Sequence, residues 1–294
     1  MDDDTWLSER FEDHRSHLRA VAYRMLGSTA EADDAVQEAW LRVSRGGADG
    51  VDNLGGWLTT VVSRVCLNVL RSRSARREEP LSIHVPDPVV ELEDHRNPER
   101  ETLLADSVGV ALLVVLDAMS PAERLAFVLH DLFALPFDEI AEVLGRSPEA
   151  TRQLASRARR RVQGEAPMPD TDLARQRQVV DAFFAAARDG DFDALLAVLD
   201  PDVVARSDGG TVRAALSSVV RGPAAVASRA ITYANPEAVL VPATVNGGAG
   251  VVVQVAGKAV SVMAFTVSAG RIVEIDSLVD PDRVARLGLD DGDR

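Results

Sequence analysis

The 294-residue chain contains a single cysteine, Cys66, so no disulfide can form within it. Val65 and Leu67 flank Cys66, which predicts a packed side chain and fits a reducing compartment. The longest uncharged apolar run, residues 107–116, is about half as long as a bilayer span requires. The opening MDDDTWLSER has neither a basic leader nor an apolar core. These absences predict a cytoplasmic protein that does not enter the membrane.

Motifs for metal or cofactor binding are also missing. The sequence has no cluster of metal ligands, no phosphate-binding glycine loop and no dinucleotide fingerprint. All five histidines, at positions 14, 17, 84, 95 and 130, precede residue 173, so an acid–base pair beyond that point would need carboxylates and Tyr233. We therefore expect no cofactor, no bound metal and no catalytic residue, and a protein that is not an enzyme.

The charge is strongly acidic overall but unevenly distributed. A formal net charge of -14 opposes indiscriminate binding to DNA. Two stretches nevertheless carry five arginines each and no acidic residue, namely positions 64–77 and 151–162. Between them, residues 78–106 hold nine acidic residues against Arg96 and Arg100. Two basic segments thus flank an acidic linker, which we place at residues 78–105.

The first part of the chain predicts three amphipathic helices. Ser28 and Glu31 form a capping box before a helix over residues 29–44, whose apolar stripe is followed by a glycine-rich break. Apolar periodicity also predicts helices over residues 11–26 and 57–71. These helices define an expected first domain at residues 1–77.

A helix-turn-helix motif is predicted after the acidic linker. Ser120 and Glu123 form a second capping box, and a helical pattern returns already near Thr102. Two striped helices then flank the turn at residues 145–147, with Ser147 as the N-cap and Pro148 just inside the second helix. A short helix, a tight glycine turn and a longer basic helix are typical of DNA-binding proteins. We place this domain at residues 106–164.

The basic helix presents two different faces. Its predicted buried side consists of Thr151, Leu154, Ala155, Ala158 and Val162. Its predicted outer side consists of Arg152, Gln153, Ser156, Arg157 and Arg160. A solvated surface helix is the alternative, but the preceding turn, the mixture of Arg with Gln and Ser, and the expected lack of acidic partners at i±4 favour major-groove contact.

The helix over residues 29–44 carries an apolar residue among carboxylates. Its expected outward face consists of Asp34, Gln37, Glu38 and Leu41. An isolated surface leucine is common and needs no cause. An acidic face with an apolar anchor is also what docking on a basic coiled-coil partner requires. The residues alone leave both interpretations open.

Two blocks resemble a known family. AEADDAVQEAWLRV with WLTTVVSRVCLNVLRSR resembles region 2 of an extracytoplasmic-function (ECF) sigma factor of the sigma-70 family, and residues 119–162 resemble region 4. The resemblance implies that the Asp34–Leu41 face binds the clamp helices of core RNA polymerase. It implies contacts with the -35 promoter element by the outer side of the basic helix, and with the -10 element by Ser63, Arg64, Asn68, Arg71 and Arg73. The acidic linker would lie in the nucleic-acid channel of the polymerase.

The composition changes from residue 173. One long amphipathic helix is expected over residues 173–199, followed by segments with strand character and glycine-rich breaks. The tail, placed at residues 173–290, resembles the SnoaL-like cone domain of the SigJ-like subgroup. The expected fold is therefore multidomain, with two all-α helical domains and a C-terminal α+β SnoaL-like domain.

The resemblance also implies a contact between this tail and the linker. The matching motifs are DGG at residues 208–210, VNG at 245–247 and VPDP at 85–88. We expect a regulatory, intramolecular contact formed by Asp208, Gly209, Gly210, Asn246, Gly247, Pro86, Asp87 and Pro88. Regulation by contact is preferred over catalysis or passive ligand sensing. The alternative for the whole chain is a free-standing helix-turn-helix regulator with a ligand-binding or enzymatic cone domain.

Overall fold

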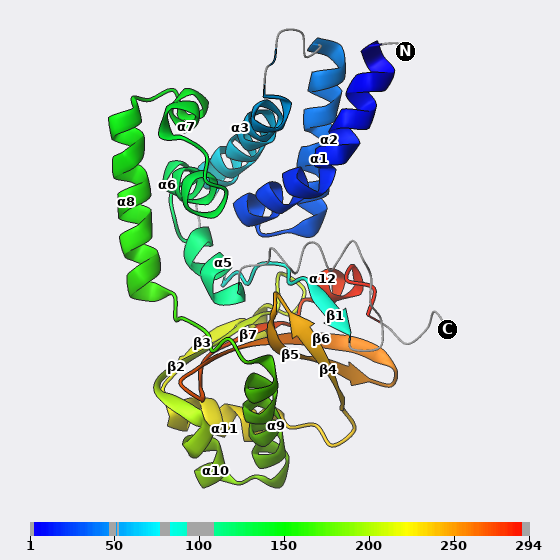
Figure 1. Ribbon diagram of the computed structural model, residues 1–294. Helices are drawn as coiled ribbons and strands as arrows, with labels where there is room; N and C mark the ends of the chain where they lie inside the picture. The colour runs from blue at the N-terminus through cyan, green and yellow to red at the C-terminus, as the bar shows by residue number, and fades with distance from the viewer. Residues whose placement is uncertain (1–2, 47–50, 52, 77–82, 93–108, 290–294) are drawn as a thin grey trace. The chain divides into compact units, whose positions relative to one another are not determined.

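The computed structural model describes residues 3–46, 51, 53–76, 83–92 and 109–289 (Figure 1). The chain divides into two compact units. The first combines Met1–Pro80 with Val115–Ala166, and the second combines Leu81–Val114 with Pro167–Arg294. The expected fold class, helical domains followed by an α+β domain, is confirmed.

Three helices begin the first unit: α1 (Asp3–Leu26), α2 (Thr29–Gly46) and α3 (Leu54–Arg76). Their apolar stripes meet in a core that includes Phe11, Leu18 and Leu58, each at most 1% exposed. Cys66 lies in this core, and burial raises the pKa of its thiol to about 12. The thiol is therefore protonated at neutral pH and serves as a packed apolar group, as its neighbours in the sequence predict.

Shorter helices follow: α5 (Val110–Asp117), α6 (Pro121–Phe127), the π-helical turn η1 (Val128–Leu132), α7 (Phe137–Leu144) and α8 (Pro148–Glu165). Ser120 caps α6 and Ser147 caps α8, with the Ser147 hydroxyl accepting from Ala150 N–H at 3.2 Å. Gly145 ends α7 with φ of 65°, a left-handed conformation that glycine adopts without strain. The predicted helix-turn-helix is confirmed, with helix and turn boundaries where the capping residues place them.

A buried arginine joins the two halves of the first unit. Arg124 is 1% exposed. Its Nε and Nη2 donate to the backbone oxygen of Arg24 at 3.3 Å, and its Nη1 donates to Asp117 at 3.1 Å. Because a buried guanidinium without acceptors is costly, these bonds fix α6 against the last turn of α1.

Among its described residues, the second unit contains a seven-stranded sheet in the order β1-β4-β5-β6-β7-β2-β3. All neighbouring strands are antiparallel except β2 and β7, which are parallel. The strands are β1 (Val90–Leu92), β2 (Leu199–Asp208), β3 (Ser218–Arg221), β4 (Val239–Val245), β5 (Gly248–Val255), β6 (Lys258–Ser268) and β7 (Arg271–Leu278). The remaining elements are α9 (Leu173–Asp189), α10 (Phe192–Val198), the 3-10 turn η2 (Ala214–Leu216), α11 (Pro223–Tyr233) and α12 (Pro281–Ala285).

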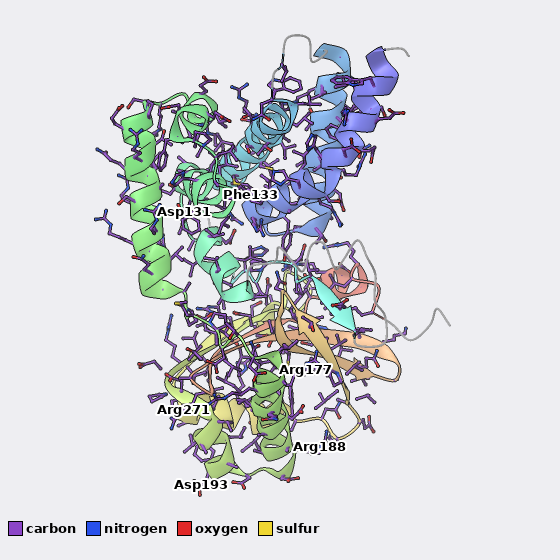
Figure 2. The ribbon with its side chains drawn as sticks, in the orientation of Figure 1. Asp131, Phe133, Arg177, Arg188, Asp193 and Arg271 are labelled. Carbon is purple, nitrogen blue, oxygen red and sulfur yellow. The ribbon has the colours of Figure 1, made fainter. Side chains whose placement is uncertain are left out.

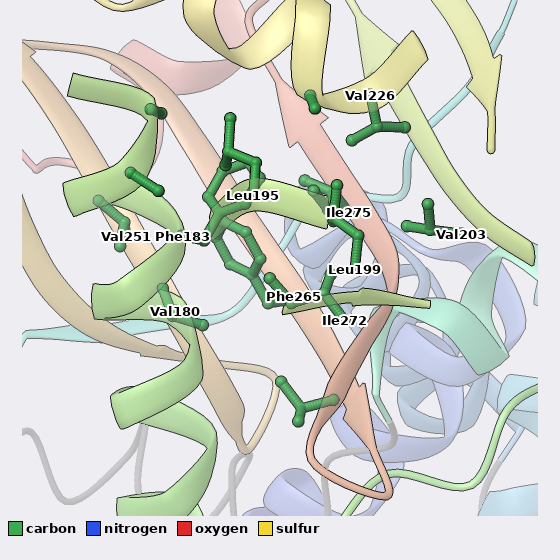
Figure 3. Close-up of a cluster of buried hydrophobic side chains, with 14 of the residues drawn as sticks. Val180, Phe183, Leu195, Leu199, Val203, Val226, Val251, Phe265, Ile272 and Ile275 are labelled. Atoms are coloured by element: carbon green, nitrogen blue, oxygen red, sulfur yellow. The ribbon is translucent and has the colours of Figure 1, made fainter. Parts of the chain in front are cut away.

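The sheet buries apolar side chains on both faces. On one face, α9, α10 and α11 pack over a core that includes Phe183, Leu195 and Ile275 (Figure 3). On the other face, Val252 and Val262 pack with Val85 and Val90, which come from the segment before α5. Along β5, side chains alternate between these faces, with Val251 in the first core and Val252 in the second, as the strand period requires.

One expectation about this unit is wrong. The single helix expected over residues 173–199 is two helices, because Gly190 adopts φ of 69° and Asp191 caps α10 by accepting from Ala194 N–H at 2.9 Å. Within the linker expected at residues 78–105, Val90–Leu92 forms an edge strand paired with β4. Residues 78–82 and 93–105 of that linker, and the helix start near Thr102, lie outside the described residues.

Candidate functional site: a clamp on the linker segment and three exposed surfaces

Asp208, at the end of β2, is the centre of a polar clamp. Its Oδ2 accepts from the backbone N–H of Val85 at 2.9 Å and from Nη1 of Arg283 at 2.7 Å. Its Oδ1 accepts from Gly210 N–H at 2.9 Å, and the His84 ring lies 3.6 Å away. Burial alone raises the pKa of Asp208, but the bonds from His84, Val85 and Gly210 and the charge of Arg283 lower it well below its usual 3.8. The buried carboxylate therefore stays ionised and holds the chain around Val85.

Arg283 in α12 completes the clamp from the opposite side. Its Nε donates to Asp87 at 2.6 Å and its Nη2 donates to the backbone oxygen of Val85 at 2.5 Å. The three side chains of Arg283, Asp87 and Asp208 are each 15% exposed or less. Partial burial reduces solvent screening, so this set of charge-assisted bonds is stronger than an exposed ion pair.

Asn246 provides a second attachment point. The side-chain Oδ1 of Asn246 accepts from the backbone N–H of Val89, and the backbone N–H of Asn246 donates to the backbone oxygen of Val89, both at 2.9 Å. Asn246 adopts φ of 49° in the β4–β5 turn, and Gly247 follows with φ of 79°. This turn aims the amide side chain of Asn246 at the segment, and β1 then continues the contact as a strand pairing in which Val90 is opposite Val245.

The two prolines and the two glycines have separate roles. Pro86 and Pro88 are buried and have no N–H, so the donors that remain at Val85 and Val89 are those that Asp208 and Asn246 accept. Gly209 is crowded by the backbone of Arg213, and Gly210 has φ of 58° and faces the carboxylate of Asp280. A side chain at either glycine would collide with these groups, which explains the DGG motif at the clamp.

The structure brings together most of the residues expected at a linker contact. Asp208, Asn246, Asp87 and the prolines all lie within residues 83–92 or directly against them, whereas Gly247 is exposed and supports the turn only. Sequence reasoning missed His84, Val85, Val89 and Arg283. We will call residues 84–92 the docked segment.

All five expected -35 residues on α8 are exposed: Arg152, Gln153, Ser156, Arg157 and Arg160. The expected lack of acidic partners is wrong, because the Nε atom of Arg161 lies 3.2 Å from Glu165 at i+4. Arg152 also lies 3.8 Å from Glu149 of the same helix, and two further partners come from outside α8: Arg157 binds Glu123 at 3.0 Å, and Arg159 binds Asp131, labelled in Figure 2. Within the described part of the chain, Arg160 forms no ion pair, so it presents an uncompensated charge.

The residues expected at the -10 element are split between surface and core. On α3, the side chains of Arg64, Asn68 and Arg71 are exposed. Ser63 is completely buried, so its inclusion in an exposed DNA surface needs correction: it lies on the core side of the helix. Arg73 is half-buried, donates to the backbone oxygen of Leu26 at 3.1 Å and pairs with Glu31.

The outward face of α2 has the exposed residues that the helix period predicts: Asp34, Gln37, Glu38 and Leu41. Leu41 is 41% exposed, although it is a large apolar side chain. Arg42 binds Glu38 at 2.9 Å. The apolar group therefore stands on an acidic helix face, available to a partner.

Comparisons with known proteins identify these helices. A model of sigma-70 region 2 matches residues 10–76, and a model of sigma-70 region 4 matches residues 109–162. These matches define a protein of the sigma-70 class. The chain belongs to the extracytoplasmic-function sigma factors of RNA polymerase, because whole-length relatives in that family are more than a third identical to it. Family membership decides against the free-standing regulator considered above.

The relatives cover the C-terminal domain as well. The chain is 37% identical to the probable ECF RNA polymerase sigma factor SigI of Mycobacterium tuberculosis, over 96% of each chain. It is 38% identical to the ECF RNA polymerase sigma factor SigJ of the same organism, over 93% of this chain and 91% of SigJ. The crystal structure of SigJ matches with a TM-score of 0.76 at 36% identity, covering 96% of this chain and 99% of that one. The resemblance to the SigJ-like subgroup is thereby confirmed.

Two further observations concern membrane spans and metal sites in the described part of the chain. Among its helices, none combines the length and apolarity needed to cross a membrane. The same part contains no group of three or more His, Cys, Asp or Glu side chains arranged to hold a metal ion.

Proposed function

We propose that the C-terminal domain restrains this sigma factor by holding the docked segment. The observation that carries the proposal is the clamp, in which Asp208, Arg283 and Asn246 bind the backbone and side chains of residues 85–89. In the sequence, the docked segment lies between the region 2 and region 4 matches. While it is held, less free chain connects the two regions, and this limits how far apart they can move. The relevant site is therefore regulatory, acts in the cytoplasm where the polymerase works, and performs no catalysis.

The C-terminal domain should lower the activity of the sigma factor, because the docked segment can occupy only one of two places. A segment paired with β4 cannot at the same time lie in the nucleic-acid channel of core RNA polymerase, where the family resemblance places the linker. Polymerase must therefore release the docked segment before the linker can enter the channel. The free energy needed for this release lowers the net free energy of binding to polymerase. The docked state therefore binds polymerase more weakly and is the less active state.

The remaining contacts are proposed as follows. The face of Asp34, Gln37, Glu38 and Leu41 docks on the polymerase clamp helices. Arg64, Asn68 and Arg71 on α3 meet the melted -10 element, where exposed bases and phosphates favour arginine and amide groups. The outer side of α8, with Arg152, Gln153, Ser156, Arg157 and Arg160, enters the -35 major groove. Each surface is exposed, which such contacts require.

Two neighbouring arginines on α8 provide a test of the -35 contact. Arg160→Ala removes an exposed charge without an ion-pair partner among the described residues, whereas Arg159→Ala removes one that binds Asp131. We expect Arg160→Ala to weaken promoter binding by holoenzyme about tenfold or more, the usual cost of a lost base or phosphate contact. Arg159→Ala should weaken it far less. Fluorescence anisotropy on a promoter fragment measures both, and equal effects of the two variants would contradict the assigned orientation of α8.

Removal of the C-terminal domain tests the restraint itself. A chain truncated after Gly164 lacks Asp208, Asn246 and Arg283, so nothing holds the docked segment. We expect tighter binding to core polymerase and several-fold more run-off transcript at limiting sigma concentration. Circular dichroism should first establish that the truncated chain keeps its helices. Unchanged polymerase affinity and transcript yield in a folded truncated chain would refute regulation by the domain.

A further inference from the structure

The α+β domain contains a cavity of about 540 Å³ between the sheet and helices α9 and α11. This volume falls within the range of about 300–1,000 Å³ typical of small-molecule sites. Much of the wall is apolar and aromatic, with Phe183 and Phe184 from α9, Val226 from α11 and Val253 and Ile275 from the sheet. The two phenylalanine rings meet edge to face at 5.4 Å between centroids and give this part of the wall an aromatic surface.

The charged residues of the cavity are all of one sign. Among the residues that the structure describes, four arginines line it, Arg188, Arg206, Arg213 and Arg229, and none of the lining residues is an aspartate or a glutamate. This is unusual in a chain with a net charge of -14. Arg206 is neutralised by Glu274 and Asp276, each at 3.1 Å. The other three form no ion pair with any residue that the structure describes, so the cavity retains uncompensated positive charge.

Hydrogen-bonding groups accompany these arginines. Ser207 and Ser277 line the cavity from adjacent strands and are opposite each other in the β2–β7 pairing. The guanidinium of Arg229 lies 5.0 Å from the centroid of the Tyr233 ring, a cation–π contact that limits its orientations. An oriented guanidinium is well suited to binding a carboxylate through two parallel hydrogen bonds.

We propose that this cavity binds an amphipathic organic anion, namely a carboxylate carried on an apolar aromatic or polycyclic body. The body would fill the space between the phenylalanines and the sheet, and the carboxylate would lie among Arg213, Arg229 and the serines. The combination of an apolar wall with several arginines disfavours cations, and it disfavours neutral apolar molecules because they leave the arginines without a counter-charge.

The cavity is contiguous with the clamp. Ser207 precedes Asp208, and Val279, which lines the cavity, donates its N–H to the backbone oxygen of Asp208 at 2.8 Å. Arg213 donates its N–H to the backbone oxygen of Gly209 at 2.9 Å. A carboxylate that draws Arg213 inward therefore acts on the DGG turn and, if the proposed restraint is correct, alters retention of the docked segment. This regulatory consequence rests on the proposed function, whereas binding itself does not.

Binding can be measured with a matched pair of probes on the full-length chain. Calorimetric titration with 1-naphthylacetate should give saturable one-to-one binding, and 2-(1-naphthyl)ethanol, which replaces the carboxylate with an alcohol, should bind at least about tenfold more weakly. Arg213→Gln and Arg229→Gln should each weaken the anion about tenfold and leave the alcohol unchanged. Arg271→Gln is the control, because Arg271 is an exposed arginine of the same domain outside the cavity lining (Figure 2).

Folding of each variant is checked by thermal unfolding, and Ala230→Trp, which fills the cavity from α11, should abolish binding of both probes. Failure of 1-naphthylacetate to bind the wild-type chain, equal affinity for the alcohol, or equal losses in Arg271→Gln would each overturn the proposal. Hydrogen exchange of the docked segment with and without 1-naphthylacetate separates the two claims: binding with unchanged exchange retains the site and rejects its coupling to the clamp.

Discussion

Replacement of Asp208 by asparagine should release the docked segment. The isosteric Asp208→Asn change keeps the shape of the side chain but removes the charge that binds Arg283 Nη1 at 2.7 Å. It also replaces one of the two carboxylate oxygens, which accept from the Val85 and Gly210 N–H groups, by an amide nitrogen that cannot accept. Hydrogen bonds to charged groups contribute about 1.5–3 kcal/mol each, so the docking equilibrium should shift by about 2 kcal/mol, or roughly 30-fold. Hydrogen exchange at the Val85 and Val89 amides should accelerate by that factor, and run-off transcription should rise.

The control for this variant lies on the same strand. Asp202→Asn removes an exposed carboxylate of β2 that is far along the strand from the docked segment. It should leave both the exchange rates and the transcript yield unchanged. Accelerated exchange without more transcript would show that the clamp is structural only, and neither effect in a folded Asp208→Asn chain would reject the clamp as a determinant of docking.

The pH dependence of the clamp has a definite sign. The folded pKa of Asp208 is lowered from 3.8, so its contribution to docking is complete above pH 3.8 and is lost only as the pH falls through the lower folded value. Titration of Asp208 therefore cannot release the docked segment between pH 6 and 8. Any switch in that range must act through another group or through a ligand.

Local signals in the sequence were enough to predict the helices. Serine caps, prolines in the first turn and Gly145 each determine the backbone within a few residues, and the structure follows them at α6, α7 and α8. Apolar periodicity alone fails at Gly190, because the apolar pattern continues from α9 into α10 although the helix ends there. The pair Gly190–Asp191 is itself a signal for this break, since the glycine ends one helix and the aspartate caps the next. Ser63 was assigned to the surface by analogy, although the helix period places it with the buried Val62 and Cys66.

The clamp could be predicted only in part, because its members come from distant positions in the chain. Asp208 and Asn246 occur in turn motifs that a sequence displays, but Arg283 has no local signature. Parallel pairing of β2 with β7 brings the end of β2 beside the start of α12, so that Asp208 and Arg283, which are 75 positions apart in the chain, form a hydrogen bond. The edge strand β1 is three residues long, too short for alternation to reveal it.

Replacement of Leu41 by glutamate should strongly weaken binding to core polymerase while leaving the fold intact. Leu41 is 41% exposed on the outward face of α2, so a charged side chain there can reach solvent and the helix can remain folded. Against a basic partner, the adjacent carboxylates Asp34 and Glu38 supply attraction, and Leu41 supplies the apolar anchor of the contact. Burying a carboxylate at the anchor position costs more than truncation, so the affinity should fall at least about 30-fold, the effect of losing a hot-spot residue.

Val239→Glu provides the matched control for this experiment, because Val239 is an apolar residue that is 59% exposed in β4 of the C-terminal domain. It should bind polymerase as the wild-type chain does. Co-purification with core enzyme gives the first measurement and surface plasmon resonance gives the affinity, with unfolding curves of both variants recorded in parallel. If Leu41→Glu binds polymerase normally, the α2 face is not the docking surface and Leu41 is an ordinary exposed leucine. If only Leu41→Glu fails to bind, α2 anchors the factor on polymerase, and the acidic balance of the chain serves this contact as well as limiting contact with random DNA.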